Sequence, residues 1–150
     1  DGEGVTEKIK TTGNTNGIAF TKALQTRDFE GLAFVNLVDF DMLYGHRRDV
    51  AGYAAAATEF DKFVADFIPG MREGDILMVT ADHGCDPSYT KTTDHTREYV
   101  PYLICGKSVK PGVDLGTKLC FGTIAQTICD YLGVDASTLD GQSVLSDILK

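Results

Sequence analysis

Short apolar runs alternate with helical patterns along this chain, and that order constrains the fold more than any other feature. Three nearly continuous apolar runs predict strands that are buried on both faces. These runs cover residues 33–38, 75–80 and 102–105. Apolar residues recur at three- and four-residue steps across 50–67 and 121–132, which predicts two helices, and a shorter helix is predicted near 18–26. Because alternating strands and helices favour right-handed crossovers, we expect an α/β fold, with a mostly parallel sheet and helices on both faces.

The composition suits one compact domain with an acidic surface. The chain has 150 residues, of which 43% are hydrophobic, a size at which a domain buries roughly 70% of its unfolded surface. It contains no internal repeat or linker, so residues 1–150 are interpreted as a single domain. Twenty-two acidic against fourteen basic residues give a net charge of -8. This sign repels phosphates, so we expect no nucleic acid and no membrane as partners.

The cysteines and the start of the chain predict a cytoplasmic protein. The four cysteines are Cys85, Cys105, Cys120 and Cys129. They form no Cys-x-x-Cys pair, and a chain of this size does not need disulfides, so we expect reduced thiols. No apolar run approaches the ~20 residues that cross a bilayer, and no secretory signal is visible. The chain begins at Asp1 without a methionine, which suggests processing or a piece of a longer protein.

Each of the three histidines lies in a short segment that also carries acidic residues. The segments contain Asp39, Asp41 and His46, then Asp82 and His83, then Asp94 and His95. The first two follow predicted strands, and ligands of open α/β sheets bind beyond the carboxyl ends of strands. The third segment must fold back from the loop after Gly84 to reach them. The three segments are therefore candidate parts of one metal-binding site.

The pair Asp82 and His83 sits at the predicted end of a strand. Neighbouring side chains point to opposite faces of a regular strand, so both address one site only where the strand ends. Gly84 permits a sharp exit there. This arrangement fits a centre with two metal ions. The alternative is that Asp82 is a turn acceptor and His83 an ordinary loop histidine.

Asp41 and His46 are five residues apart across Gly45, so they converge if this loop curls back. A carboxylate oxygen and an imidazole nitrogen are then suitable metal ligands. The alternative is a surface loop in which acidic residues pair with Arg47 and Arg48.

Arg47 and Arg48 have two further interpretations. They could hold a phosphate, or they could lock Asp49 behind the metal ligands, and we favour the second role. In the third segment, Asp94 could orient the imidazole of His95, with Arg97 and Glu98 as a local ion pair. A solvated loop with a charged face is the alternative.

The chemistry of these ligands suits a transition metal. Carboxylates with imidazoles favour Mn²⁺, Zn²⁺ or Fe²⁺ over the all-oxygen sites of Mg²⁺ and Ca²⁺. Two such cations ~4 Å apart would hold a phosphoryl group and lower the pKa of an attacking hydroxyl. Cys85 lies beside the Asp82–His83 pair, and we interpret it as a bystander thiol.

These residues stand in longer strings that resemble a known family. The strings are VNLVDFDMLYGHRRDVAGYAAA, VTADHGCDPSYTKTTDHTREYVPYLICG and FGTIAQTICDYLGV. They are similar to the C-terminal part of the core domain of the bacterial phosphopentomutase family, within the alkaline phosphatase superfamily. The resemblance covers almost the whole chain and implies a partial alkaline phosphatase-like core. It further implies an isomerase that interconverts ribose or deoxyribose 1-phosphate and 5-phosphate, with two Mn²⁺ ions and a phosphothreonine.

The resemblance also implies residue roles. One metal site would consist of Asp41, His46 and His95. The other would contain Asp82 and His83, with a further aspartate from the N-terminal part of the family. The residues expected to support these ligands from behind are Arg47, Arg48, Asp49, Asp94 and Arg97.

Several parts of the family have no counterpart in this sequence. They are the early strand with the further aspartate, the threonine nucleophile and the cap domain that holds the sugar phosphate. We therefore expect a C-terminal portion that is inactive alone and needs the missing N-terminal part of the same protein, or that pairs with a second copy. The alternatives are another enzyme of the superfamily, a phosphate-ester hydrolase or a phosphoglycerate mutase, and a non-catalytic metal-binding module.

Overall fold

The computed structural model describes residues 2–150, which form two compact units. The helical unit comprises the residues up to 28, 34–70 and 81–101, and the sheet unit comprises 29–33, 71–80 and 102–150. The single domain expected for residues 1–150 stays a prediction. Throughout residues 2–150, every helix is too short or too polar to cross a bilayer.

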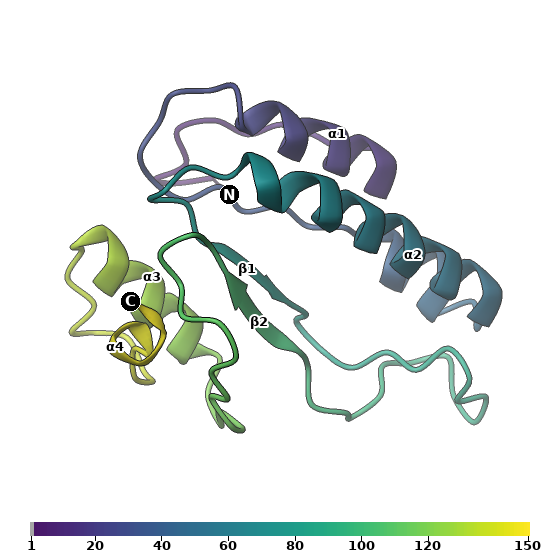
Figure 1. The fold of residues 1–150 in the computed structure, drawn as a ribbon. Coiled ribbons are helices and arrows are strands. Elements are labelled where there is room, and N and C mark those ends of the chain that lie inside the picture. The colour runs from purple at the N-terminus through teal and green to yellow at the C-terminus, as the bar shows by residue number, and fades with distance from the viewer. Residues whose placement is uncertain (1) are drawn as a thin grey trace. The chain divides into compact units, whose positions relative to one another are not determined.

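The helical unit contains two α-helices, which Figure 1 labels, and two short helices of other types. They are α1 (Asn14–Leu24), the π-helix η1 (Phe40–Gly45), α2 (Val50–Phe67) and the 3₁₀-helix η2 (Ile68–Gly70). The predicted helix at 50–67 is confirmed, and Asp49 begins it by accepting a hydrogen bond from the Gly52 N–H at 2.9 Å. The first helix begins at residue 14 rather than 18.

Aromatic side chains pack η1 and α2 together. The Phe40 ring meets Tyr53 and Phe60 edge-on, with ring centroids 5.3 and 6.5 Å away. Phe63, which is buried, continues this row along α2 and lies 5.8 Å from Phe60 and 5.2 Å from Phe67. These contacts explain the apolar spacing of the sequence, because residues three and four apart share one face of a helix.

Polar contacts fix α1 at both of its ends. At the start, Asp39 Oδ2 accepts from the Asn14 N–H at 2.7 Å, and Asn14 Oδ1 accepts from the Asp39 N–H at 3.0 Å. Near the end, Gln25 Nε2 donates to the Phe67 carbonyl at 2.7 Å. Asp39 therefore has a structural role at the start of α1, next to the segment that carries Asp41.

The sheet unit contains a two-stranded sheet and two helices. They are β1 (Leu77–Thr80), β2 (Tyr102–Cys105), α3 (Gly122–Leu132) and α4 (Leu145–Ile148). The core of this unit is formed by Val109, Val144 and Ile148. Partly buried residues that pack against this core are Ile76, Tyr102, Ile104, Leu115 and Leu145. At the end of α3, Gly133 takes the left-handed conformation with a φ of 66°, which stops the helix as glycine at this position commonly does.

The mixed α/β class is confirmed, but on a sheet of two strands among the described residues. The expectation of a parallel sheet is wrong for this pair, because β1 and β2 are antiparallel, with Leu77 opposite Cys105 and Thr80 opposite Tyr102. A parallel pair needs a crossover element, and the structure places no helix in the connecting residues 81–101.

The predicted strand at 33–38 is also wrong. In the part of the chain that the structure describes, these residues pair with no strand, and the Phe34 side chain is 84% exposed. An apolar run becomes a strand only where a neighbouring backbone completes its hydrogen-bond ladder. The run itself does not specify that neighbour.

Candidate metal centre

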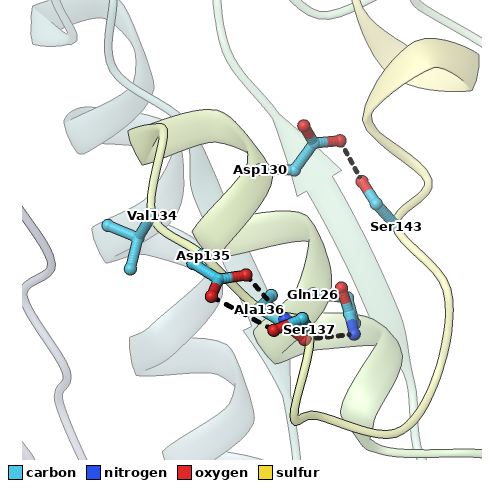
Figure 2. A pocket seen from close by; sticks show the side chains of 7 residues that line it. All are labelled: Gln126, Asp130, Val134, Asp135, Ala136, Ser137 and Ser143. Atoms are coloured by element: carbon cyan, nitrogen blue, oxygen red, sulfur yellow. Dashed lines mark hydrogen bonds between the residues drawn. The ribbon is translucent and has the colours of Figure 1, made fainter.

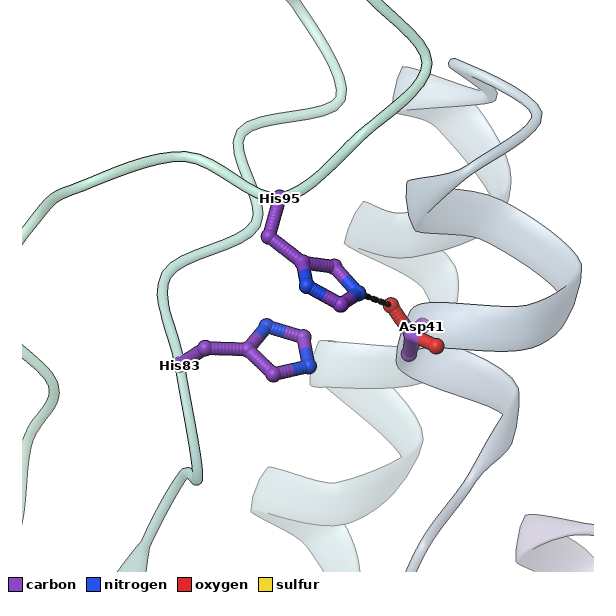
Figure 3. Close-up of side chains that lie close together, drawn as sticks. All are labelled: Asp41, His83 and His95. Atoms are coloured by element: carbon purple, nitrogen blue, oxygen red, sulfur yellow. Dashed lines mark ion pairs between the residues drawn. The ribbon is translucent and has the colours of Figure 1, made fainter.

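Three segments of the helical unit bring histidines to the carboxylate of Asp41 (Figure 3). Ligand atoms of Asp41, His83 and His95 all lie within 4.8 Å of one another. His46 approaches the same carboxylate from the end of η1, with its Nε2 3.3 Å from Asp41 Oδ1. We call these four residues the Asp41 cluster. They come from one helical turn and two loop segments, so the fold and not local sequence creates the site.

Two histidines of the Asp41 cluster approach the same oxygen atom, Oδ1 of Asp41. His95 Nε2 lies 3.4 Å from Asp41 Oδ1, close to the 3.3 Å of His46. The His46 and His95 rings are 4.9 Å apart, and the His83 and His95 rings stack at 3.5 Å. The structure thus brings together the set Asp41, His46 and His95, and it adds His83, which the resemblance implied for the other metal site.

The π-helix explains how Asp41 and His46 meet. In a regular α-helix, residues five apart are rotated by roughly 140° about the axis, which separates their side chains. In η1 the wider turn is closed by the His46 N–H, which donates to the Asp41 carbonyl at 3.0 Å. Gly45 is buried here, and a Cβ on it would lie 2.9 Å from the Phe40 carbonyl oxygen and against the Cys85 sulfur. Glycine is therefore required in this turn.

Backbone carbonyls set the tautomers of two histidines. His46 Nδ1 lies 2.5 Å from the Thr93 carbonyl oxygen, and His83 Nδ1 lies 3.1 Å from that of Gly84. A carbonyl only accepts hydrogen bonds, so each Nδ1 carries the proton and donates. In the neutral imidazole the lone pair is then on Nε2, the atom that His46 turns toward Asp41. Metal-binding histidines commonly have this arrangement.

The residues of the Asp41 cluster fit a divalent cation. One carboxylate oxygen and several Nε2 atoms form a mixed set of oxygen and nitrogen donors, which suits Mn²⁺, Zn²⁺ or Fe²⁺. The Asp41 side chain is 33% exposed, so an ion could enter from solvent. Asp82 is not brought into the cluster. Its side chain is 86% exposed and its Oδ1 lies 3.5 Å from His83 Nε2.

Only some of the residues expected to support the metal ligands contact the cluster segments in the structure. The five residues are Arg47, Arg48, Asp49, Asp94 and Arg97. Asp94 accepts from the His95 N–H at 2.8 Å, and this bond, with the nearby imidazole, lowers the pKa of its carboxyl group. Asp49 caps α2 and is not locked by an arginine. Arg47 and Arg97 are exposed and form no hydrogen bond or ion pair within residues 2–150, so the expected pairing of Arg97 with Glu98 is wrong. Long exposed side chains gain little from such pairs.

The loop that carries His95 is closed at a narrow neck. The Thr96 N–H donates to the Gly84 carbonyl at 3.0 Å, and Thr96 Oγ1 accepts from the Asp86 N–H at 2.7 Å. We call residues 85–95 the His95 loop. Sequence reasoning missed the parts of this loop that act through the backbone, above all the carbonyl of Thr93. Every residue type has a carbonyl, so the sequence contained no signal for it.

Cys85 lies closer to the Asp41 cluster than the sequence suggested. Its sulfur is 3.9 Å from Asp41 Oδ1. Burial raises the pKa of the Cys85 thiol, the Asp41 charge raises it further, and the Arg48 guanidinium opposes both effects. The thiol form is thereby favoured, which is consistent with a bystander rather than a thiolate ligand.

The sheet unit has a separate pocket beside α3 (Figure 2). Its lining residues are Gln126, Asp130, Val134, Asp135, Ala136, Ser137 and Ser143. Both acids already bond to hydroxyls, Asp130 to Ser143 at 2.6 Å and Asp135 to Ser137 at 3.1 Å. No basic side chain lines this pocket, so it does not suit a phosphate.

Comparisons with known proteins agree with a metal centre. Residues 2–136 match the family described as the Metalloenzyme superfamily. The chain is 51% identical over 148 residues to the phosphopentomutase of Acetivibrio thermocellus and 50% identical over 149 residues to that of Lachnoclostridium phytofermentans, covering 99% of this chain in each case. It is 47% identical over 150 residues to that of Anaeromyxobacter sp. (strain K). The chain spans 38% of the length of each of these relatives. Since the family match extends over most of the sequence, the chain belongs to the metalloenzyme superfamily.

Proposed function

We propose that this chain supplies most of the metal ligands of a phosphopentomutase. Such an isomerase interconverts the 1-phosphate and 5-phosphate of ribose or deoxyribose through a phosphothreonine. The convergence of three histidines on Asp41, from segments far apart in the sequence, is the observation that carries the proposal. The similarity to proteins named phosphopentomutase over 99% of the chain supports this substrate class.

Two Mn²⁺ sites are proposed, and this chain supplies more of the ligands of the first site than of the second. Asp41, His46 and His95 hold the first, and the 3.3 and 3.4 Å distances to Asp41 Oδ1 support this set. Asp82 and His83 hold the second, together with an aspartate from outside these 150 residues. When bound, the ions would neutralise a phosphoryl group and lower the pKa of the attacking hydroxyl. The chain's own contribution is to orient the imidazoles through the Thr93 and Gly84 carbonyls.

The remaining parts of the reaction are proposed to come from elsewhere in the same protein. The threonine nucleophile and the groups that bind the sugar have no counterpart in the sequence described here. The 150-residue chain would therefore bind metal without turning over a pentose phosphate. We propose that both units belong to one catalytic core in a cytoplasmic protein of nucleoside catabolism, in agreement with the four free cysteines. Self-association of the chain is a further expectation.

Metal titration tests the site directly. Calorimetric titration of the 150-residue chain with Mn²⁺ should show one bound ion per chain, and Asp41→Asn should abolish binding. Asp61→Asn is the matched control, because Asp61 is an exposed aspartate of α2 outside the cluster. His46→Ala should likewise abolish binding, whereas His83→Ala, which removes a proposed ligand of the second ion, should leave the single bound ion in place. Equal affinity of the unaltered chain and Asp41→Asn would refute the assignment.

A chimera tests the reaction. This chain would replace the matching 148 residues of the Acetivibrio thermocellus relative, to which it is 51% identical. We expect the chimera to convert ribose 1-phosphate to ribose 5-phosphate. The His95→Ala chimera should lose at least about 100-fold in rate, since even residues behind metal ligands contribute 10- to 100-fold. Turnover of phosphoglycerate or simple phosphate esters instead would favour another superfamily enzyme, and metal binding without turnover would favour a non-catalytic module.

A further inference from the structure

Arg48 uses every hydrogen-bond donor of its guanidinium group on backbone carbonyls. Its Nε donates to Thr92 at 2.9 Å, and Nη2 donates to Thr92 at 2.6 Å and to Asp94 at 2.5 Å. Its Nη1 donates to Asp86 at 3.0 Å and to Gly45 at 3.2 Å. A guanidinium has five N–H donors, so none is left for a phosphate. This geometry argues against a substrate-binding role for Arg48.

The four carbonyls belong to two of the three segments that form the Asp41 cluster. Gly45 ends η1 immediately before His46, whereas Asp86, Thr92 and Asp94 belong to the His95 loop. Arg48 thus ties the loop to the turn that holds Asp41. Between two of the bound carbonyls lies Thr93, whose own carbonyl accepts from His46. Directly after Asp94 comes His95.

The backbone of Arg48 is strained in a way that its side chain offsets. Its φ is 56°, and it is the one non-glycine residue with positive φ among residues 2–150. Side chains other than glycine are disfavoured in this left-handed region. The five hydrogen bonds compensate for that conformation. A glycine at this position would relieve the strain and remove the bonds, which makes the two contributions separable.

We propose that Arg48 is a positioning residue, which holds the His95 loop against η1 and thereby sets the affinity and geometry of the metal site. This inference rests on the proposed metal-binding function. From the sequence, Arg47 and Arg48 were both expected to support the metal ligands, and the proposal assigns this role to Arg48 alone. Arg47 is exposed and has no partner within the described chain. The adjacent arginine is therefore a matched control of the same charge.

Two measurements on the full 150-residue chain test the proposal. Titration with Mn²⁺ should show a dissociation constant roughly 10- to 100-fold higher in Arg48→Gly and Arg48→Ala than in the unaltered chain. Arg47→Ala should have the same Mn²⁺ dissociation constant as the unaltered chain. Amide hydrogen exchange in metal-free protein should accelerate across residues 85–95 in Arg48→Gly and not in Arg47→Ala. The thermal unfolding temperature of Arg48→Gly should be equal to or higher than that of Arg48→Ala, because glycine relieves the strain of the positive φ.

Chemical rescue distinguishes positioning from general stability. Methylguanidinium added to Arg48→Ala should restore part of the Mn²⁺ affinity, and the visible absorption of the Co²⁺-loaded site should return toward that of the unaltered chain. Unchanged affinity in Arg48→Gly, with Mn²⁺ bound normally by the unaltered chain, would overturn this inference and leave the proposed function intact. Absence of Mn²⁺ binding in the unaltered chain would overturn both.

Discussion

The Nδ1–H group of His46 donates to the carbonyl oxygen of Thr93 at 2.5 Å, across 47 positions of the sequence. This contact fixes the orientation of the ring and leaves Nε2 facing Asp41. It also makes the His46 side chain a support for the His95 loop. A ligand and the loop that delivers another ligand therefore stabilise each other.

The first prediction concerns the tautomers of the histidines. In their neutral forms, His46 and His83 should carry the proton on Nδ1, because each Nδ1 faces a carbonyl. Nitrogen-15 NMR of the imidazoles in metal-free protein measures this directly. Addition of diamagnetic Zn²⁺ should then shift the Nε2 signal of His46. A proton on Nε2 of neutral His46 would contradict the geometry.

The second prediction separates stability from metal binding at Asp49. Because Asp49 accepts from the Gly52 N–H at the start of α2, Asp49→Ala should lower the free energy of unfolding by about 0.5–2 kcal/mol. Asp49→Asn keeps an acceptor and should lose less. Urea denaturation followed by circular dichroism gives both values. Mn²⁺ affinity should be unchanged in both variants, whereas a role for Asp49 behind the ligands would lower it.

Asp41 should control the reactivity of Cys85. Burial and the Asp41 charge raise the Cys85 thiol pKa, so less thiolate is present at any pH below that pKa and alkylation is slow. In Asp41→Asn the charge is gone, the pKa falls, and iodoacetamide should modify Cys85 faster. Cys105 is the internal control, because burial alone raises its pKa. Peptide mass spectrometry at about pH 8, in metal-free protein, follows both thiols. An equal change at both cysteines would indicate general loosening instead.

In the sheet unit, the buried hydroxyl of Thr127 should contribute measurably to stability. It donates to the Thr123 carbonyl at 2.7 Å and accepts from the Val144 N–H at 3.0 Å, with the residue fully buried. Thr127→Val leaves that N–H without a partner and should reduce the free energy of unfolding by about 1–3 kcal/mol. Thr127→Ser keeps the hydroxyl and should be less affected. Equal destabilisation of the two variants would assign the effect to packing of the methyl group.

Periodic patterns predicted helices α2 and α3 of this chain well. Phe60, Phe63 and Phe67 are spaced three and four residues apart and lie on one face of α2, and that helix has the predicted bounds. The strand at 102–105 also agrees. The run at 33–38 failed because a strand depends on a partner backbone, and the parallel arrangement failed because no helix connects β1 to β2.

The convergence of the candidate ligands was predictable from the sequence, whereas the contacts that hold them in place were not. Asp41, His46 and His95 were identified from residue type and from the family resemblance, and they meet in the structure. The five carbonyl bonds of Arg48 were not foreseeable, because the acceptors are backbone atoms of Gly45 and the His95 loop. Contacts of side chains with backbone depend on loop conformation, which residue types determine only weakly.

The neck of the His95 loop has a practical consequence for studying this protein. Thr96 closes the loop at Gly84 and Asp86, and Arg48 holds Thr92 and Asp94, so the ligand side of the loop is fixed independently of its tip. The exposed tip at residues 89–91 lies beyond these contacts. A fluorophore or a short peptide tag inserted there should leave the Mn²⁺ affinity unchanged, and cleavage after Lys91 should yield two pieces that remain associated.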